Sequence, residues 1–577
     1  MSRKSILAFN KSLVRLLPSS SHPIPIWTVL LSGPSTFRVH ESHSHRKCYS
    51  QNHSSKFNYS SEHENASGES WNKSGIFGAF TGLTLAAYVA WRKSEQNGVH
   101  AATVRMESEE IKKDLPTYKS SEVAVHYNPE TKIWVTFKRG VYDVTEFVEK
   151  HPGGSRIMMA AGASLEPFWE LYPVHQRPDV FQILAKYRIG NLSEEDVLEQ
   201  QQPAEDHFKN EPKRHPVLKQ RSLKPFNGET PPSILAEQFY TPNDVFYVRN
   251  HLPVPQVDVK SYCLEIEGIS IKSSSLRLDD VKKFPKVTIA ATIQCGGNRR
   301  SDMSKAKPSA GLAWSGGAIG NAKWTGASLK DILKKAGFDP KKYPHPEKVH
   351  VQFEGLDSDQ SGECYGASIP LTYFLDENFE PVLAYEMNDK SIPIDHGFPL
   401  RVILPGIVGA RSVKWLSRII ISNQESQSLW QQRDYKVFSP SVTMESVDFN
   451  SAPAIMDTPV TSYICSHEDG QVVAQGNIKM QGYAFSGGGR GIVRVEISKN
   501  RGNTWEVATI KHKAPSAARN WAWVMWEAEV AVNKQDKEIW VKAVDTGYNQ
   551  QPEDFKNVWN YRGLVSTAYH KITLNVK

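Results

Sequence analysis

Cysteine is scarce in this sequence, and its spacing excludes several classes of protein. The 577 residues contain five cysteines: Cys48, Cys263, Cys295, Cys364 and Cys465. They form no C-x-x-C motif and no Cys/His spacing that suits zinc. A disulfide framework is therefore not expected. Each cysteine has to be interpreted alone.

Other signatures are missing as well. The sequence has no G-x-x-x-x-G-K-[ST] phosphate loop and no G-x-S-x-G nucleophile elbow. No dense run of Lys and Arg interleaved with stacking aromatics occurs, and the formal net charge of +7 is modest. We therefore expect no nucleic-acid partner.

Acidic residues are absent from the first forty positions, which contain Arg3, Lys4, Lys11, Arg15 and Arg38 among many serines. A basic, Ser-rich and acid-poor composition is typical of a mitochondrial transit peptide. We predict a transit region over residues 1–74.

Residues 75–91 (GIFGAFTGLTLAAYVAW) form an uncharged apolar run that begins after Lys73 and ends before Arg92. This length is at the short edge of the roughly 17 to 25 residues that span a membrane. We interpret residues 75–102 as a sorting or stop-transfer segment that leaves the protein in the mitochondrial intermembrane space. The alternative is a retained anchor, and membrane contact is expected only through this presequence if it stays uncleaved.

The chain is too long for one hydrophobic core, and 39% hydrophobic with 23% charged residues is ordinary for globular protein. We predict a multidomain α+β protein. The predicted units are a small α+β unit over 115–196, a polar flexible linker over 197–216, a mixed α+β unit over 217–436 and an immunoglobulin-like β-sandwich over 437–577. Alternation with period two around a turn at 500–503 predicts a hairpin in the last unit.

The first unit contains two histidines near expected helix ends. Residues 132–137 (KIWVTF) read as a strand, and Thr145 is expected to cap a short helix that ends at His151. His175 follows a second helical stretch. With apolar residues between them, the two histidines could ligate a haem iron from both sides, which suits one-electron transfer. Either histidine alone would more simply be a capping or surface residue.

A second candidate is Cys295, at the end of a β-branched stretch (VTIAATIQ) and before Gly296, Gly297 and the pair Arg299 and Arg300. A thiolate needs positive neighbours to stay ionised near neutral pH, and it is a soft ligand for a transition metal. The alternatives are a buried small hydrophobe and a nucleophile with a nearby base.

Two family resemblances organise these observations. The segment VYDVTEFVEKHPGG…EPFWELYPVH resembles the cytochrome b5 family, which makes His151 and His175 the axial ligands of a haem iron. The blocks FYVRNHLPVP, QCGGNRR, FEGLDSD, YGASIPL, LAYEMN, DHGFPLRVILPG, VGARSVKWL, QRDYKVFSPSV and SAPAI together resemble the animal-type mitochondrial sulfite oxidase family. Gly296 departs from the alanine expected in animal members.

The resemblance implies two cofactors, haem b and a molybdenum-molybdopterin. Cys295 would be the protein thiolate on molybdenum. The pterin and its phosphate would be held by residues spread over the predicted catalytic unit: Phe246, Tyr247, Val248, Arg249, Asn250, Asp357, His396, Arg401, Ser412, Val413 and Lys414. Arg, Lys and protonatable His are natural partners of phosphate.

The resemblance also implies the substrate pocket and the reaction. Sulfite would meet Arg249, Arg300 and Arg562, with Trp314 and Tyr435 lining the pocket, and Tyr435 could donate a hydrogen bond to substrate. Sulfite would be oxidised to sulfate by oxygen-atom transfer at molybdenum. Electrons would pass singly through the haem to cytochrome c, with oxygen as another acceptor, in a homodimer joined through the C-terminal domain.

Two rivals to a sulfite oxidase remain. A nitrate reductase shares the molybdenum and haem modules, but its eukaryotic form usually places the haem domain after the molybdenum domain and adds a flavin domain. A non-catalytic haem carrier with a binding sandwich would contain iron and no molybdenum.

Overall fold

The computed structural model describes residues 108–200, 206–359, 362–444, 446–512 and 519–577. The predicted transit region and the apolar run at 75–91 lie outside the described residues. Within the part of the chain that the structure describes, no helix is both long and apolar enough to cross a membrane.

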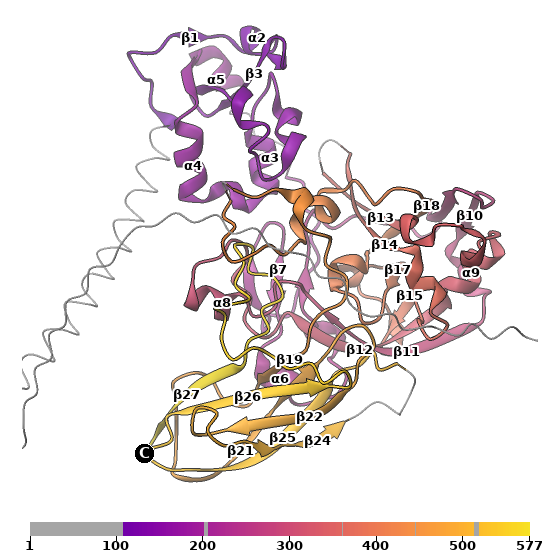
Figure 1. Cartoon of the computed structure of the whole chain (residues 1–577). Helices are drawn as coiled ribbons and strands as arrows, with labels where there is room; N and C mark the ends of the chain where they lie inside the picture. Colours follow the sequence, from indigo (N-terminus) through magenta and orange to yellow (C-terminus); the bar gives the residue numbers. More distant parts are fainter. Residues whose placement is uncertain (1–107, 201–205, 360–361, 445, 513–518) are drawn as a thin grey trace, which may run out of the picture. The chain divides into compact units, whose positions relative to one another are not determined.

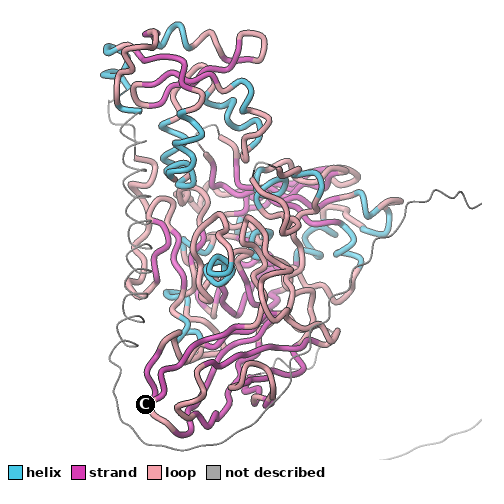
Figure 2. Tube along the Cα trace, turned by 60° about the vertical axis from the view of Figure 1, so that its left-hand side comes forward, coloured by secondary structure: helices cyan, strands magenta, loops and turns pink. Residues whose placement is uncertain are grey.

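The first described unit is a small α+β unit built on a five-stranded sheet in the order β1-β5-β4-β3-β2. Its strands are β1 (Thr117–Tyr118), β2 (Tyr127–Asn128), β3 (Lys132–Phe137), β4 (Gly140–Asp143) and β5 (Arg188–Leu192). Its helices are α2 (Ser120–Val123), η1 (Thr145–Phe147), η2 (Gly154–Ala160), α3 (Glu166–Leu171), η3 (Pro173–Gln176), α4 (Pro178–Ala185) and α5 (Glu194–Gln200). Figure 2 shows these short helices beside the strands of the sheet.

The strand predicted at 132–137 is confirmed as β3, whose apolar side chains Ile133, Val135 and Phe137 enter the core of this unit. The prediction that Thr145 caps a helix is wrong. Thr145 is the first residue of η1 and makes no cap hydrogen bond. Its hydroxyl instead donates to Asp143 Oδ1 at 2.5 Å and accepts the Ile133 N–H at 2.9 Å, so it ties the turn to the sheet.

The residues just before the predicted catalytic unit are in contact with it. Val254 N–H donates to Glu211 Oε1 at 3.0 Å, and Arg214 donates two hydrogen bonds of 2.8 Å to the carboxylate of Asp395. Phe208 is buried. Residues 206–216 of the predicted linker therefore lack helix and strand but are anchored by side-chain contacts.

The catalytic unit contains three sheets. The smallest is β6-β7-β8, with β6 (Lys219–Ser222), β7 (Asn227–Glu229) and β8 (Val248–Arg249). The second is β10-β9-β18-β13-β14, with β9 (Cys263–Gly268), β10 (Ser274–Arg277), β13 (His350–Ser358), β14 (Cys364–Pro370) and β18 (Leu416–Ser422). The third is β11-β12-β15-β16 with β17 paired to β15; its strands are β11 (Lys286–Gln294), β12 (Ile319–Ser328), β15 (Val382–Met387), β16 (Lys390–Ser391) and β17 (Arg401–Ile403).

Short helices connect these strands and cover the sheets. They are α6 (Pro232–Leu235), η4 (Asn243–Val245), α7 (Leu278–Lys282), α8 (Arg300–Ala306), α9 (Leu329–Lys335), η5 (Pro340–Lys342), η6 (Pro346–Lys348), η7 (Leu371–Leu375), η8 (Ile394–His396), η9 (Gly409–Arg411), η10 (Trp430–Asp434) and η11 (Phe449–Ser451). η10 is a π-helix, a form that frequently occurs at functional sites. The sheets share one large apolar core that includes Trp314, Trp324 and Tyr435.

The C-terminal unit is a sandwich of two sheets, in the orders β19-β21-β25-β24 and β20-β27-β26-β22-β23. Its strands are β19 (Thr461–Ile464), β20 (Gln471–Val473), β21 (Gly476–Phe485), β22 (Ile492–Ser498), β23 (Glu506–Val507), β24 (Thr509–His512), β25 (Val524–Val532), β26 (Glu538–Asp545) and β27 (His570–Val576). Figure 1 shows them in orange and yellow. The hairpin predicted around 500–503 is confirmed, since β22 pairs antiparallel with β23.

Arg299 joins the catalytic unit to the sandwich. It is only 1% exposed and is the N-cap residue of α8, with its backbone in the left-handed region at φ 64°. Its guanidinium donates to the carbonyl oxygens of Ala568 (2.7 Å), Ser462 (3.3 Å) and Tyr569 (3.3 Å), and to Asp302 Oδ2 at 3.0 Å. Of the two arginines that follow Cys295, Arg299 therefore stabilises the junction between the catalytic unit and the sandwich.

We predict that Arg299→Leu lowers the free energy of unfolding by about 3 kcal/mol, because it leaves buried carbonyl groups and Asp302 without their donor. The midpoint of urea unfolding, followed by tryptophan fluorescence, measures this. Arg501→Leu is the matched control, since Arg501 is exposed and pairs with Glu538 at the surface; it should change stability by less than about 0.5 kcal/mol. Equal midpoints for the two variants would contradict the role of Arg299.

Candidate active site and cofactor sites

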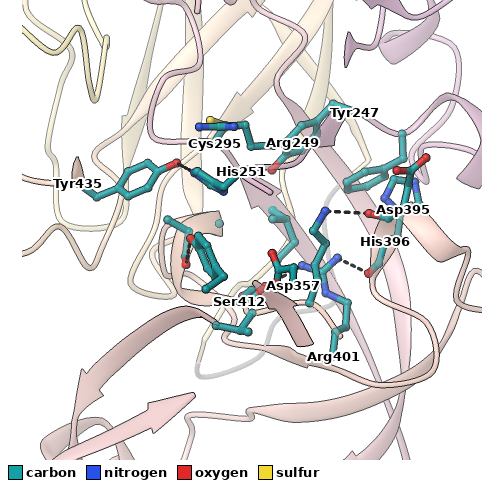
Figure 3. Close-up of a pocket in the computed structure, with 17 residues that line it drawn as sticks. Tyr247, Arg249, His251, Cys295, Asp357, Asp395, His396, Arg401, Ser412 and Tyr435 are labelled. Atoms are coloured by element: carbon teal, nitrogen blue, oxygen red, sulfur yellow. Dashed lines mark hydrogen bonds between the residues drawn. The ribbon is translucent and has the colours of Figure 1, made fainter. Parts of the chain in front are cut away.

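A cavity in the catalytic unit gathers most of the residues that the sequence points to. Its walls are made by Phe246, Tyr247, Arg249, His251, Ile293, Cys295, Asp357, Tyr365, Asp395, His396, Arg401, Gly409, Ala410, Ser412, Val413, Lys414 and Tyr435. Figure 3 shows Cys295, Arg249, His251 and Tyr435 at one end and Asp357, His396 and Arg401 at the other. The cavity thus has a thiol end and a charged end.

Cys295 follows directly after β11 and is 6% exposed. Its backbone N–H donates to Ala318 O at 3.0 Å, which fixes the end of the strand, and the Gly297 N–H points at Sγ at 3.4 Å. A Cβ on Gly296 would lie 3.3 Å from Tyr435 Cδ1, so the glycine leaves space between the thiol segment and the tyrosine ring.

The segment that contains β8 supplies one wall. Arg249 Nη1 donates to Asn227 Oδ1 at 3.2 Å and to Asn250 O at 2.5 Å, which holds the guanidinium at the cavity. Asn250 is buried and donates to Asp395 Oδ1 at 3.0 Å. Val248 packs into a separate small cluster with Leu218 and does not line the cavity.

The charged end is built from four separate segments. Lys414 Nζ donates to Asp395 O at 2.9 Å and to Asn250 Oδ1. Arg401 donates to His396 O at 2.8 Å and to Ser412 O at 2.9 Å. These contacts hold the ammonium group of Lys414 and the guanidinium of Arg401 beside the cavity. Each group keeps N–H donors that a ligand can use.

Burial shifts the pKa values of these groups strongly. It lowers the pKa of Lys414 to about 7 and that of Arg401 to about 10, and it raises the pKa of Asp357 to about 7. Burial also lowers the pKa of His396 to about 4, and its Nε2 lies 3.1 Å from Asn243 O. Its Nε2–H therefore donates to this backbone carbonyl, and the role of His396 as a partner of the pterin phosphate stays a prediction.

Unpartnered buried atoms test whether a cofactor fits. Among the described residues that line the cavity, Asp357 Oδ1 and Arg401 Nε are buried and have no hydrogen-bond partner in the protein. Leaving such atoms unpaired costs about 1 to 3 kcal/mol each, so they call for a polar ligand. A phosphorylated pterin with acceptor and donor groups satisfies this requirement, and the thiol of Cys295 at the far end suits a soft metal. The residues therefore fit a molybdopterin.

The structure brings Arg300, Trp314 and Arg562 close to the cavity but not into its walls. Arg300 donates to Arg562 O at 2.9 Å and to Leu312 O at 2.8 Å. Arg562 pairs with Asp434, and burial, together with Arg300, lowers its pKa to about 9. Trp314 is fully buried in the core.

Sequence reasoning missed six cavity residues that the structure adds: His251, Ile293, Tyr365, Asp395, Gly409 and Ala410. His251 and Asp395 lie in the motifs FYVRNH and DHGFPLR, from which neighbouring residues were predicted to belong to the site. The motifs therefore marked this part of the chain but assigned no role to these two residues. Tyr365 comes from β14 and begins the motif YGASIPL, which likewise indicated the family without assigning this residue to the site.

The α+β unit holds its two histidines in a geometry that fits haem. The imidazole rings of His151 and His175 are 10° from parallel, with centroids 6.1 Å apart. Two metal–nitrogen bonds of about 2 Å each fit into that gap together with half of each ring. His151 Nδ1 lies 3.1 Å from Gly154 O, so the N–H on Nδ1 donates there and Nε2 is free as a ligand.

His175 is the weaker-held member of the pair. Its Nδ1 is buried without a partner among the described residues, and Trp169 packs nearly parallel to its ring at 5.4 Å. Burial lowers the pKa of His175 to about 3, so the ring is neutral and able to bind a metal.

Comparisons with known proteins agree with these sites. Residues 119–193 match the cytochrome b5-like haem/steroid-binding domain, residues 251–430 the oxidoreductase molybdopterin-binding domain, and residues 452–577 the Mo-co oxidoreductase dimerisation domain. The three domains together define a molybdenum- and haem-containing oxidoreductase with molybdopterin and haem as its cofactors.

Comparison with curated relatives identifies the family within this class of oxidoreductases. The chain is 47% identical over 516 residues to the mitochondrial sulfite oxidase of Drosophila melanogaster, covering 86% of this chain and 89% of the relative. It is 46% identical over 517 residues to the mitochondrial sulfite oxidase of Homo sapiens, covering 89% and 91%. Nitrate reductase [NADH] 1 of Phaseolus vulgaris is 34% identical over 372 residues, covering 61% of this chain and 42% of the relative. The chain belongs to the sulfite oxidase family, and a mitochondrial location follows from its animal relatives.

We predict that Lys414→Met lowers the molybdenum content of the purified protein at least tenfold, since the anionic end of the pterin loses a buried donor. Molybdenum analysis and the haem spectrum of the same sample measure the effect. The haem spectrum should stay unchanged, because Lys414 belongs to the catalytic unit. Lys390→Met, at an exposed residue of β16, is the control and should retain full molybdenum. Full molybdenum content in Lys414→Met would contradict the assignment.

Proposed function

We propose that this protein is a sulfite oxidase that converts sulfite and water to sulfate, two protons and two electrons. Cys295 is the protein thiolate on molybdenum, and the electrons leave singly through the haem bound by His151 and His175. The physiological acceptor is cytochrome c, with oxygen as the alternative, in the mitochondrial intermembrane space. The C-terminal sandwich joins two copies in a homodimer.

The observation that carries this proposal is the gathering of cationic side chains next to a buried thiol. Arg249 lines the cavity with Cys295, and Arg300 and Arg562 lie directly behind them. Burial lowers the pKa of Arg300, and Arg562 is affected in the same direction, because cations are costly where water is excluded. A small dianion relieves that cost, so the pocket selects an oxyanion over a neutral molecule.

Each residue then has a physical task. The bound molybdenum cofactor supplies oxygen-atom transfer and accepts the two electrons. Arg249 is held by Asn227 and keeps a fixed orientation toward the oxyanion. Arg300 is held by two carbonyl oxygens and Arg562 by Asp434, so little side-chain entropy is lost when substrate binds.

The first test is to add sulfite anaerobically to the purified protein and record the haem absorption bands. Rapid haem reduction by sulfite, absent with sulfate or nitrite, is the expected result. A haem that stays oxidised in a sample with full molybdenum content would refute the function. Nitrate that rapidly reoxidises the reduced protein would favour the nitrate reductase rival, and a sample with iron but no molybdenum-binding capacity would favour the haem carrier.

We expect Cys295→Ser to abolish sulfite turnover, by at least about 1,000-fold in kcat, because a hydroxyl is a poor ligand for the metal. The haem spectrum, which depends on a separate unit, should be unchanged. Cys465→Ser, at a buried cysteine of the sandwich that packs in a cluster with Leu235 and Ile319, is the matched control and should keep turnover. Retained turnover in Cys295→Ser would rule out the ligand assignment.

Arg249→Gln is expected to raise the sulfite KM about 10- to 100-fold and to lower kcat/KM accordingly, because a charged hydrogen bond of about 1.5 to 3 kcal/mol is lost. Steady-state kinetics at fixed ionic strength measure the change. An unchanged response to sulfite would show that Arg249 does not face the substrate.

A further inference from the structure

The end of the predicted linker reaches the charged end of the cavity through one arginine. Arg214 donates two hydrogen bonds of 2.8 Å, from Nε and Nη2, to the two carboxylate oxygens of Asp395. Asp395 belongs to η8, lines the cavity and lies beside His396 in Figure 3. The two partners are 181 residues apart in the chain, so tertiary structure alone creates this contact.

Packing holds the Arg214 side chain in this place. The side chain is only 11% exposed, and its guanidinium carbon lies 4.4 Å from the centre of the Phe226 ring. Glu211 accepts a further hydrogen bond from Nη2. Phe226 packs with Val248 of β8, the neighbour of the cavity residue Arg249. The guanidinium is therefore built into the catalytic unit, although residues 211–216 contain neither helix nor strand.

The Asp395 carboxylate is occupied by donors other than Lys414. Oδ1 accepts from Arg214 and from Asn250 Nδ2 at 3.0 Å, and Oδ2 accepts from Arg214. Lys414 Nζ bonds instead to the backbone oxygen of Asp395 at 2.9 Å and to Asn250 Oδ1. Because an ammonium group has three N–H donors, one donor of Lys414 remains for a ligand in the cavity.

Arg214 also determines the charge of Asp395. Burial by itself raises the pKa of this carboxyl, but the hydrogen bonds and the charge of Arg214 outweigh burial and, with smaller contributions from Lys414 and His396, hold the pKa below its ordinary value. Asp395 is thus an anion whose main counter-ion is Arg214. Since Asp395 and Lys414 also attract each other, Lys414 is the cation to which this carboxylate would turn if Arg214 lost its charge.

We propose that Arg214 is a positioning residue for the molybdopterin: it holds and neutralises the Asp395 carboxylate, so that the ammonium group of Lys414 stays available to the anionic end of the cofactor. The last residues of the predicted linker then belong to the cofactor site. This role concerns retention of the cofactor, so it goes beyond the proposed oxidation of sulfite and does not depend on which oxyanion the enzyme oxidises.

The test measures how well full-length variants retain the cofactor. The ratio of molybdenum to haem is the first readout, because the haem unit is separate and reports the amount of folded chain. The second is the rate at which the pterin is released on warming, followed by the fluorescence of the oxidised pterin. Arg214→Met keeps a side chain that can pack on Phe226 but removes the charge. It should lower the ratio and speed release about tenfold, since loss of a residue that orients a ligand typically weakens binding by about 10- to 100-fold.

Two further variants separate neutralisation of Asp395 from simple anchoring of the segment. Arg214→Lys keeps the charge but loses the two-pronged contact, and its release rate should stay within about threefold of that of the parent protein. The double variant Arg214→Met/Asp395→Asn leaves no charge at position 395 to compete for Lys414. Release should therefore return to within about threefold of the parent rate, because removing both partners costs far less than leaving one charge unpaired.

Arg519→Met is the matched control. Arg519 likewise donates two hydrogen bonds to a carboxylate far away in the chain, that of Asp376, but neither residue lines the cavity. This variant should keep the molybdenum content and the release rate of the parent protein. If Arg214→Met does not accumulate in folded form, Arg214→Gln takes its place, since it keeps a donor for Asp395 but no charge.

Two results would overturn the proposal. One is a parent-like molybdenum content and release rate in Arg214→Met. The other is a double variant that releases the cofactor as fast as Arg214→Met, which would show that Arg214 only anchors its segment. None of these measurements uses sulfite, so failure of sulfite to reduce the haem would refute the proposed function and leave the role of Arg214 to be decided by cofactor retention alone.

Discussion

The structure of the active site depends on the burial of positive charge in and beside one cavity. Lys414, Arg401, Arg300 and Arg562 all have lowered pKa values because burial penalises their charged forms. Uncompensated burial of a cation costs several kcal/mol, so the folded chain is built to receive anions. A phosphorylated cofactor at one end and an oxyanion at the other relieve this cost, and ligand binding thereby stabilises the fold.

Holding those cations requires a scaffold that resists their repulsion. Arg401 comes from β17, Lys414 from the segment before β18 and Arg300 from α8, and carbonyl oxygens of the neighbouring backbone accept their hydrogen bonds. Arg562 is held by the carboxylate of Asp434. Arg411, fully buried, does the same for η10: it donates to Trp430 O at 3.0 Å and Gln431 Oε1 at 2.6 Å. This fixes the backbone that presents Tyr435 opposite His251.

The sequence and the structure agree where the information is local or where motifs are long. Alternating β-formers predicted β3 and the β22–β23 hairpin, and the ordered motifs predicted the residues at both ends of the cavity. They disagree where a side chain has several possible hydrogen-bond partners. Thr145 bonds to Asp143 and the β3 backbone in place of a helix end, and Arg299 turns to the sandwich while Arg300 stays near Cys295.

The sequence alone determined the domain types, the cofactor class and the cysteine to be considered as ligand, because these depend on composition, periodicity and motifs that each lie within a short segment. Only the tertiary structure decided which of those residues meet. Tyr365 and Asp395 lie in motifs that indicated the family but not their place in the cavity wall, and His251 gains its partner Tyr435 across 184 residues. The lowered pKa values of Lys414, Arg401 and His396 follow from burial and neighbouring charge, which exist only once the chain has folded.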